Sequence, residues 1–287
     1  MKVAYLGPEN TFTGVAVRKM FPTAELVDVR HIKEIVLAVE NGSTDMGVLP
    51  YENIVEGHVT QSLDALTKYL RHAQVVRELA LPIVHCFGAL KNHRDILEIY
   101  SKDQALSQCD EWLSDHYPNA EPISVSSTAT AAQRIISENL VHAAAIASKR
   151  GLKGLEVLAE DILPGNRTRF FAIGKAPTPP TGDDKTLLAL HPSEKDKPGL
   201  LYHSLSPIEL LGINMGDILS RPDRKIIGRS HYFVIEIMGH ESEVHVMEAV
   251  REIKAYLDIQ NKFPDAVRVL GSYPNSHWED EERWKKD

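Results

Sequence analysis

The chain has 287 residues, a length that favours two domains, and its 43% hydrophobic and 25% charged residues are typical of a globular protein. Its formal net charge of −8 argues against a nucleic acid or an anionic membrane as partner, because both require a basic face. A small anionic ligand is not excluded, since it needs only a local positive site.

Cysteine content and hydropathy both favour a cytoplasmic protein. The two cysteines, Cys86 and Cys109, are too few for a disulfide framework, so we expect buried thiols in a reducing compartment. The N-terminal apolar run, Val3 to Leu6, is too short for a signal peptide. No apolar stretch approaches the ~18 residues of a membrane span.

The first part of the chain alternates predicted strands with predicted helices. Strands are expected at 2–6, 25–29, 46–50, 97–101, 122–125 and 143–148, with a long apolar run at 81–90. Helices are expected at 13–20 and 32–42, and from Gln104 and Ala129 onwards. Strands separated by helices favour parallel sheets with right-handed crossovers. We therefore predict an α/β fold in two lobes, lobe A at about 1–78 and 155–176 and lobe B at about 79–154, with a cleft as the ligand site.

A proline-rich stretch, KAPTPPTGDDK (175–185), marks a predicted domain boundary with a linker at 177–184. The catalytic part would then be 1–176, and the second domain 185–273. Its predicted elements follow the order β-α-β-β-α-β, the split pattern of small ligand-sensing domains. They are strands at 186–190, 213–219, 231–239 and 266–271 and helices at 199–212, which contains Pro207, and 242–257. The tail, 274–287, is rich in charge and is interpreted as a solvated end.

Motifs for common cofactors and metals are missing from the sequence. There is no GxxxxGK[ST], no GxGxxG opening a helix and no GxSxG. The stretch HESEVH (240–245) spaces its histidines five apart and contains no HExxH. We therefore expect no metal and no organic cofactor.

Hydroxyl and amide side chains follow three predicted strands at the points where helices begin. Ser and Thr are favoured helix N-caps, so capping by itself can explain them. The carboxyl ends of parallel strands are also where α/β sheets bind ligands, and helix N-termini attract carboxylates. Both interpretations stay open, and the second favours a small dicarboxylate. The residues are Thr11 and Thr13 in GPENTFTG, Ser101 and Gln104 in SKDQALSQ, and Ser126, Ser127 and Thr128 in SVSSTATAA.

A fourth polar stretch, PYENIVEGHV (50–59), follows the strand at 46–50. Its carboxylates, Glu52 and Glu56, could serve as acid and base or could simply pair locally. Asn53 is the better ligand candidate, because an amide both donates and accepts hydrogen bonds.

A fifth stretch, GNRTRFF (165–171), places polar side chains at the start of a predicted apolar strand. Asn166, Arg167, Thr168 and Arg169 stand there after a Pro-Gly turn. A loop in that position can offer them to a ligand, although a solvated turn would show the same pattern.

Taken in order, GPENTFT, PYENIVEG, SKDQALSQC, SSTATAA and NRTRFFAIG resemble the prephenate dehydratase family. The second part is similar to an ACT regulatory domain, with KPGLLYHSL and INMGDILSRP where that family has its amino-acid-binding motifs. The resemblance covers about residues 1–274. It implies conversion of prephenate to phenylpyruvate in phenylalanine biosynthesis, and a two-lobed cleft like that of type 2 periplasmic binding proteins. It also implies homodimers or homotetramers and feedback by L-phenylalanine.

The resemblance carries over to individual residues. Thr168 matches the family's catalytic threonine, and Asn53 and Glu56 join it as catalytic candidates. The implied substrate contacts are Thr11, Thr13, Ser101, Gln104, Ser127, Thr128, Asn166, Arg169 and Phe170. The implied effector contacts are Gly199, Leu200, Leu201, Asn214, Leu219, Ser220, Arg221 and Pro222.

A mechanism follows as a hypothesis. Thr168 would donate a hydrogen bond to the leaving hydroxyl of prephenate, with a proton relayed by water or Glu56. Arg169 would bind the keto-acid carboxylate that survives into product, or would brace the site from behind. The departing carboxylate would occupy a drier region near Phe170 or Phe171, since strong pairing with it would stabilise the ground state.

Three departures from the family pattern stand out. The chain has Asn10 where the family usually has Gly, and Ile54 where it usually has Ser. Leu200 and Leu219 replace the Ala and Glu of the two ACT motifs, so we expect weak inhibition by phenylalanine. Two other functions remain open: a non-catalytic binding protein for an aromatic acid or amino acid, and a regulatory protein that works through its ACT-like part. Stoichiometric binding without product would support either.

Overall fold

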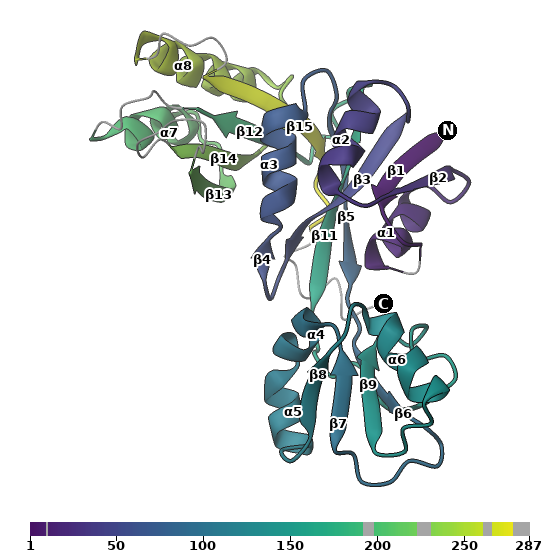
Figure 1. Cartoon of the computed structure of the whole chain (residues 1–287). Coiled ribbons are helices and arrows are strands. Elements are labelled where there is room, and N and C mark those ends of the chain that lie inside the picture. The colour runs from purple at the N-terminus through teal and green to yellow at the C-terminus, as the bar shows by residue number, and fades with distance from the viewer. Residues whose placement is uncertain (10, 192–197, 223–230, 261–265, 278–287) are drawn as a thin grey trace. The chain divides into compact units, whose positions relative to one another are not determined.

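The computed structural model describes residues 1–9, 11–191, 198–222, 231–260 and 266–277 (Figure 1). Asn10 therefore lies outside the described residues. The chain divides into two compact units. Unit 1 consists of Met1–Glu52, His58–Ala80 and Arg169–Asp287, and unit 2 consists of Asn53–Gly57 and Leu81–Thr168. Among the described residues, no helix is long and apolar enough to cross a membrane.

The first sheet lies in unit 1 and has the strand order β2-β1-β3-β11-β5, with β4 paired to β3. β1 pairs in parallel with β2 and β3, as the alternation of strands and helices predicted. Helix α2 buries the predicted stripe Ile32, Ile35, Val36 and Val39. The elements are β1 Lys2–Leu6, α1 Phe12–Met20, β2 Glu25–Val29, α2 Ile32–Glu40, β3 Met46–Asn53, β4 Gly57–His58, α3 Thr60–Tyr69, β5 Gln74–Pro82 and β11 Arg167–Gly174.

The second sheet belongs to unit 2 and has the order β10-β6-β9-β7-β8. Its elements are β6 Cys86–Ala89, β7 Glu98–Ser101, α4 Asp103–Gln108, α5 Asp110–His116, β8 Glu121–Ser124, α6 Thr128–Ser137, β9 Ala143–Ala147 and β10 Glu156–Ala159. β7, β8 and β9 run parallel, but β6 is antiparallel to both β9 and β10, so the sheet is mixed. Because β10 pairs with β6, the chain does not leave this sheet near residue 155 as predicted; unit 2 continues to Thr168.

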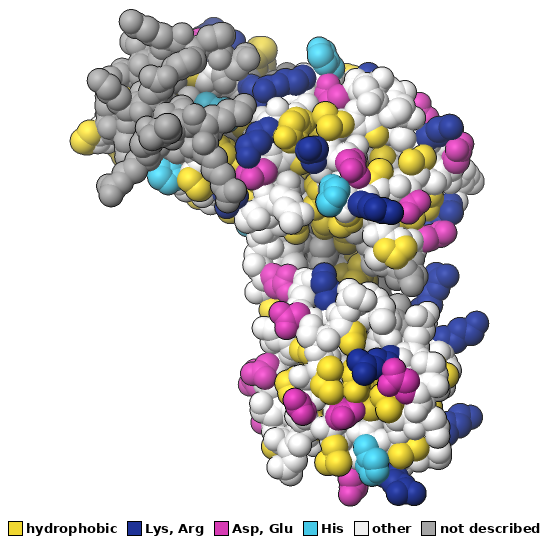
Figure 2. All heavy atoms as spheres, in the orientation of Figure 1, with side chains coloured by type: hydrophobic (Ala, Val, Ile, Leu, Met, Phe, Trp, Pro, Cys, Tyr) yellow, Lys and Arg dark blue, Asp and Glu magenta, His cyan; other side chains and the backbone are white. Residues whose placement is uncertain are grey.

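Both cysteines lie in unit 2 and are buried free thiols, as predicted. Burial raises the pKa of Cys109 to about 12, so this thiol stays protonated at neutral pH. On the face of the molecule shown in Figure 2, acidic and basic side chains are interspersed.

The third sheet is antiparallel, has the order β13-β14-β12-β15 and is assigned to unit 1. Its elements follow the predicted order β-α-β-β-α-β: β12 Asp184–Leu190, α7 Leu200–Leu210, β13 Met215–Pro222, β14 His231–Met238, α8 Val244–Gln260 and β15 Val267–Pro274. Pro207 lies inside α7. Side chains alternate across β12: Leu188 and Leu190 pack with residues of α7 and α8, whereas Leu187 and Ala189 face the opposite way.

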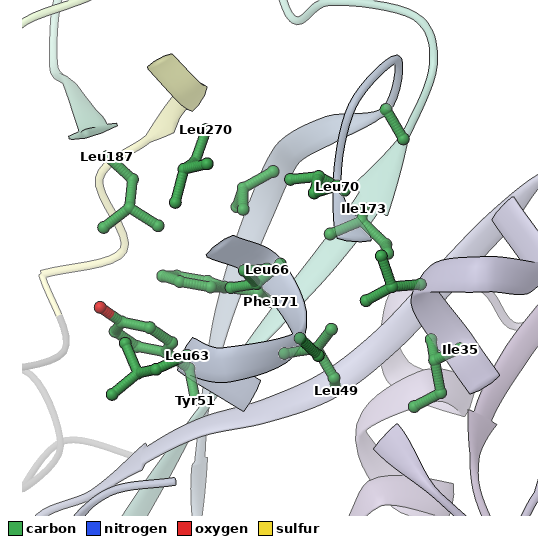
Figure 3. Close-up of a cluster of buried hydrophobic side chains, with 14 of the residues drawn as sticks. Ile35, Leu49, Tyr51, Leu63, Leu66, Leu70, Phe171, Ile173, Leu187 and Leu270 are labelled. Carbon is green, nitrogen blue, oxygen red and sulfur yellow. The ribbon is translucent and has the colours of Figure 1, made fainter. Parts of the chain in front are cut away.

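That opposite face of the third sheet shares one hydrophobic core with the first sheet. Figure 3 shows Leu187 and Leu270 of the third sheet in the same cluster as Leu63 and Leu66 of α3 and Phe171 of β11. The Phe171 ring stacks on Tyr51 at 4.0 Å between centroids. The proline-rich stretch therefore connects two parts of the chain that are packed together, because each would otherwise expose an apolar surface to water.

Gly271 marks a close backbone approach in this shared core. It has φ +147°, and a Cβ atom built there would lie 2.1 Å from the Val75 carbonyl oxygen of β5. Only glycine fits this position, since it tolerates positive φ and lets the backbones of β15 and β5 approach.

We predict that Gly271→Ala destabilises the chain by about 1–3 kcal/mol more than Gly212→Ala, because it adds overpacking to backbone strain. Gly212 is the matched control, since it has φ +68° with no atom within 4 Å of an added Cβ. Urea unfolding followed by circular dichroism would measure both variants. Equal losses of unfolding free energy would contradict the role given to the close approach.

Candidate active site

Asn53 is the centre of a polar cluster in unit 2. It is the last residue of β3 and is 7% exposed. Its Oδ1 accepts hydrogen bonds from the backbone N–H groups of Val55 (3.0 Å) and Glu56 (3.1 Å). These two donors identify Oδ1 as the oxygen of the amide, so Nδ2 must point the other way.

The Nδ2 group of Asn53 faces residues at the start of β11. It lies 2.8 Å from Asn166 Oδ1 and 3.0 Å from Thr168 Oγ1, and also 3.0 Å from the Arg167 carbonyl oxygen. Thr168 Oγ1 is the acceptor in its contact with Asn53, so the hydroxyl hydrogen of Thr168 can be directed elsewhere. The half-buried Thr168 is thereby prepared as a hydrogen-bond donor.

Asn166 carries the clearest sign of a ligand contact. Its side chain is 3% exposed, and within the described ranges its Nδ2 atom has no hydrogen-bond partner. A buried unpaired donor costs about 1–3 kcal/mol, so such groups are kept where a ligand or water binds them. The sequence placed Asn53 in one motif and Asn166 and Thr168 in another, and the structure brings the three together.

Glu56 is held by two amide side chains of helix α4. Gln104 Nε2 donates to its Oε2 at 2.5 Å, and Gln108 Nε2 donates to its Oε1 at 2.9 Å. Both oxygens therefore act as acceptors, an arrangement that suits a carboxylate and not a carboxylic acid. Gln104 was predicted as a substrate contact; in this structure its amide orients Glu56, and its Oε1 accepts from Lys102.

His85 extends this cluster below the surface. Its Nε2 lies 3.0 Å from Gln108 Oε1. Because Gln108 Nε2 already donates to Glu56, Gln108 Oε1 must accept, and His85 Nε2 carries the proton. Burial lowers the pKa of His85, so the ring is neutral at pH 7. Neither His85 nor Gln108 was identified from the sequence, since a single His and a helical Gln carry no recognisable spacing.

Arg169 does not point into an open site. It is 1% exposed, and its guanidinium lies among the carboxylates of Glu78, Glu236 and Glu52. Burial would lower the pKa of Arg169, but the surrounding acidic groups raise it well above its usual value. Of the two roles predicted for Arg169, this geometry suits the brace and does not suit a direct contact to substrate.

The predicted hydroxyl contacts lie at or just inside helix N-termini, except for Ser101, which lies on a strand. Thr11 and Ser127 are N-caps whose oxygens accept from Gly14 N and Thr130 N, both at 3.1 Å, which is the capping alternative that the sequence left open. Thr13 is buried in α1, and Thr128 begins α6. Ser101 has no exposed surface and donates to the Ile146 carbonyl oxygen at 2.7 Å, so it joins β7 to β9.

One group of residues has the chemistry of a metal site. Glu52, His58 and Asp217 offer ligand atoms that lie within 4.8 Å of one another. His58 Nε2 is 2.7 Å from Asp217 Oδ2 and 3.4 Å from Glu52 Oε2. Burial raises the pKa of Glu52, with the negative charges of Asp217 and Glu236 adding to the effect.

The predicted effector residues lie in the third sheet and α7. Gly199, with φ +80°, precedes α7, in which Leu200 is buried and Leu201 half-buried; Asn214, Ser220 and Pro222 are exposed. On β13, Leu219 packs against the core shared with the first sheet. Arg221 pairs with Asp64 of α3 at 3.4 Å. Two of the predicted effector residues, Leu219 and Arg221, therefore face the first sheet.

We predict that the chain loses stability as pH falls below about 6.5, the usual pKa of histidine. The folded state holds His85 with a lowered pKa, so the unfolded state takes up the proton first and is favoured. His85→Gln should flatten this dependence between pH 7 and pH 5, measured by urea unfolding. The exposed His116, on α5 of the same unit, gives the control His116→Gln. Equal slopes for the two variants would contradict the prediction.

Comparisons with known proteins identify the family of the chain. The family model for prephenate dehydratase matches residues 3–178. The chain is 39% identical to the bifunctional chorismate mutase/prephenate dehydratase of Pseudomonas aeruginosa, over 96% of this chain and 74% of that protein. It is 33% identical to the prephenate dehydratase of Lactococcus lactis subsp. lactis, over 95% of this chain and 97% of that protein. The crystal structure of prephenate dehydratase from Arthrobacter aurescens in complex with L-Phe superposes with a TM-score of 0.83, at 31% identity, covering 96% of this chain and 90% of that one. The chain therefore belongs to the prephenate dehydratase family.

Proposed function

We propose that this chain converts prephenate to phenylpyruvate in phenylalanine biosynthesis. Family membership supports the reaction, and both curated relatives named above carry prephenate dehydratase in their names. The observation that carries the proposal is the hydrogen bond from Asn53 Nδ2 to Thr168 Oγ1, at 3.0 Å. It turns Thr168 into a donor, which is what departure of the substrate hydroxyl requires.

The reaction can be written around this donor. The bond between the ring carbon and one carboxylate breaks, its electron pair enters the ring, and carbon dioxide departs. The ring carbon–oxygen bond breaks in the same process, and the leaving oxygen takes up one proton to become water. Aromatisation of the ring drives both events. Thr168 lowers the barrier by donating a hydrogen bond to the oxygen as negative charge develops on it.

Thr168 is too weak an acid to supply the proton by itself, so a second group must replace what it gives. We propose that this proton comes from bulk solvent and is relayed by a water bound beside the Glu56 carboxylate. The amides of Gln104 and Gln108 support this role, because they fix both oxygens of Glu56 as acceptors. Asn166 Nδ2, buried and unpaired within the described part of the chain, is the proposed donor to the substrate.

Some predicted substrate contacts are kept and others are reassigned. Thr11, Thr13, Ser127 and Thr128 remain proposed contacts through their helix N-termini. Phe170 is 1% exposed, so its proposed part is to keep the region beside Thr168 dry. Ser101 is withdrawn because its hydroxyl is fully buried on a backbone carbonyl. Arg169 is reassigned from binding substrate to bracing β11.

The assignment of the three sheets to a catalytic part and a regulatory domain is also a proposal. The sheet of β1–β3 and the sheet of unit 2 are assigned to a catalytic part of the type 2 periplasmic-binding-protein kind. The third sheet with α7 and α8 is assigned to an ACT domain, supported by its strand order β13-β14-β12-β15 and two helices. A homodimer or homotetramer and a cytoplasmic location stay predictions from the family resemblance.

A binding protein without turnover is less well supported than an enzyme. That alternative depended on Ile54, which stands where the family usually has Ser. The Ile54 side chain is 45% exposed, and its backbone N–H donates to the Arg167 carbonyl oxygen at 3.0 Å. The substitution therefore leaves the backbone link between β3 and β11 in place, and Asn53 still reaches Thr168.

We predict that Thr168→Ala lowers kcat by about 100- to 1,000-fold with little change in KM, the loss expected for one donor to a developing charge. Thr168→Ser keeps the hydroxyl and should retain much of the activity. Absorbance of phenylpyruvate formed from prephenate measures both, and undiminished turnover in Thr168→Ala would rule out the proposed role.

Feedback by L-phenylalanine gives a further prediction, motivated by the L-Phe in the Arthrobacter aurescens structure. Leu200 is buried at the start of α7 and is bulkier than the usual Ala, so inhibition of the natural chain should be weak. Leu200→Ala should bind L-phenylalanine more tightly by calorimetry and be inhibited at lower concentration. Strong inhibition at micromolar L-phenylalanine in both chains would contradict this.

A further inference from the structure

Arg169 lies in a buried network of charges that joins the first and third sheets. Its Nε is 2.5 Å from Glu78 Oε2 on β5, its Nη2 contacts Glu236 on β14, and its Nη1 is 3.7 Å from Glu52 on β3. Three carboxylates from three strands therefore surround one guanidinium. The rings of Tyr51 and Phe171 cover it at 5.3 Å and 4.9 Å from their centroids.

The fully buried members of the network are balanced in charge, whereas the third carboxylate, Glu52, is only half-buried. Lys185 on β12 lies 3.3 Å from Glu236 Oε1 and 3.8 Å from Glu78 Oε1. Two fully buried cations, Arg169 and Lys185, thus face two fully buried carboxylates, Glu78 and Glu236. Burial would raise the pKa of Glu236, but the charges of Arg169 and Lys185 lower it, so the carboxylate is ionised. Removing one member leaves a buried charge uncompensated, which is strongly destabilising.

A third residue, in addition to Arg169 and Lys185, holds Glu236 in place. Tyr273 on β15 donates its hydroxyl to Glu236 Oε2 at 2.6 Å. The position of the Arg169 guanidinium is therefore set by β14, β12 and β15 of the third sheet as well as by β5. Arg169 directly follows Thr168 on β11, so fixing its guanidinium fixes the backbone that carries the Thr168 hydroxyl.

We propose that Glu236 is a positioning residue for Thr168 and acts through Arg169. Glu236 is distant in sequence from the motifs that indicated the active site, and it belongs to the sheet assigned to regulation. In register it faces Asp217 of β13, the strand that carries predicted effector residues. A conformational change in the third sheet can therefore alter the position of Thr168 through the buried ion pair between Glu236 and Arg169. The inference depends on the proposed function, because it concerns the same reaction.

The test compares Glu236→Gln with Glu252→Gln in the full chain, using prephenate as substrate. Glu252 is exposed on α8 and pairs only at the surface with Arg251, at 3.3 Å, so it controls for loss of one carboxylate from the same domain. Glu236→Gln should lower kcat about 10- to 100-fold with KM within about threefold, because a small displacement of a reacting group affects turnover more than binding. Glu252→Gln should behave as the natural chain.

A double variant separates positioning from stability. Glu236→Gln should also lower the melting temperature, since it leaves the buried positive charges in excess. Lys185→Gln combined with Glu236→Gln removes one charge of each sign and should regain much of the melting temperature. Its kcat should stay low, because Arg169 still lacks its anchor on β14. Recovery of both quantities in the double variant would overturn the inference and leave Glu236 a purely structural residue.

Tyr273→Phe tests the positioning role of Glu236 if the Glu236→Gln variant fails to fold. It removes the hydroxyl that holds Glu236 and keeps the buried ring, so kcat should fall in the same direction by a smaller factor. A kcat equal to that of Glu252→Gln would overturn the inference. A natural chain that makes no phenylpyruvate would overturn the proposed function as well, whereas an active chain with unaffected variants would overturn the positioning role alone.

Discussion

The buried guanidinium of Arg169 is the constraint on which much of unit 1 depends. A charge at 1% exposure is tolerated only when partners replace water, and here the partners come from β3, β5 and β14. Such a network contributes little net stability compared with apolar packing, but it penalises every arrangement that separates its members. It therefore specifies how the first and third sheets meet, and the apolar cluster of Figure 3 stabilises that arrangement.

The same constraint explains why the third sheet packs against the first sheet. Leu187 and Leu270 lie in one core with the side chains of α3 and β11, and Gly271 lets the β15 backbone approach β5. Arg268 of β15 donates to the carbonyl oxygens of Thr67 and Leu70 at the end of α3, which have no partners within that helix. Apolar packing, a glycine contact and a helix cap thus act on one interface. Arg169 belongs to that interface and directly follows Thr168 in the chain, which links the interface to the proposed chemistry.

In unit 2 the corresponding constraint is the orientation of amides. Asn53 uses its oxygen on two backbone N–H groups, and this leaves its nitrogen to face Asn166 and Thr168. Gln104 and Gln108 direct their nitrogens at Glu56, and His85 completes the chain of donors behind Gln108. Each amide has one donor end and one acceptor end, so fixing one end fixes the hydrogen bonding of the next group. Neutral groups thereby set which of Thr168 and Glu56 donates and which accepts.

The sequence by itself determined the local elements and the chemistry of the motifs. The stripe of α2, the order β-α-β-β-α-β and the motif series around Asn53 and Thr168 depend on periodicity and residue type, which are local properties. Strand β5 and helix α3 were missed, and β10 was placed in the wrong lobe, because strand pairing depends on partners distant in the chain. Only the tertiary structure decided that Ser101 is buried and that Arg169 faces Glu78 and Glu236, since a single Glu within a strand gives no sign of the cation it will meet.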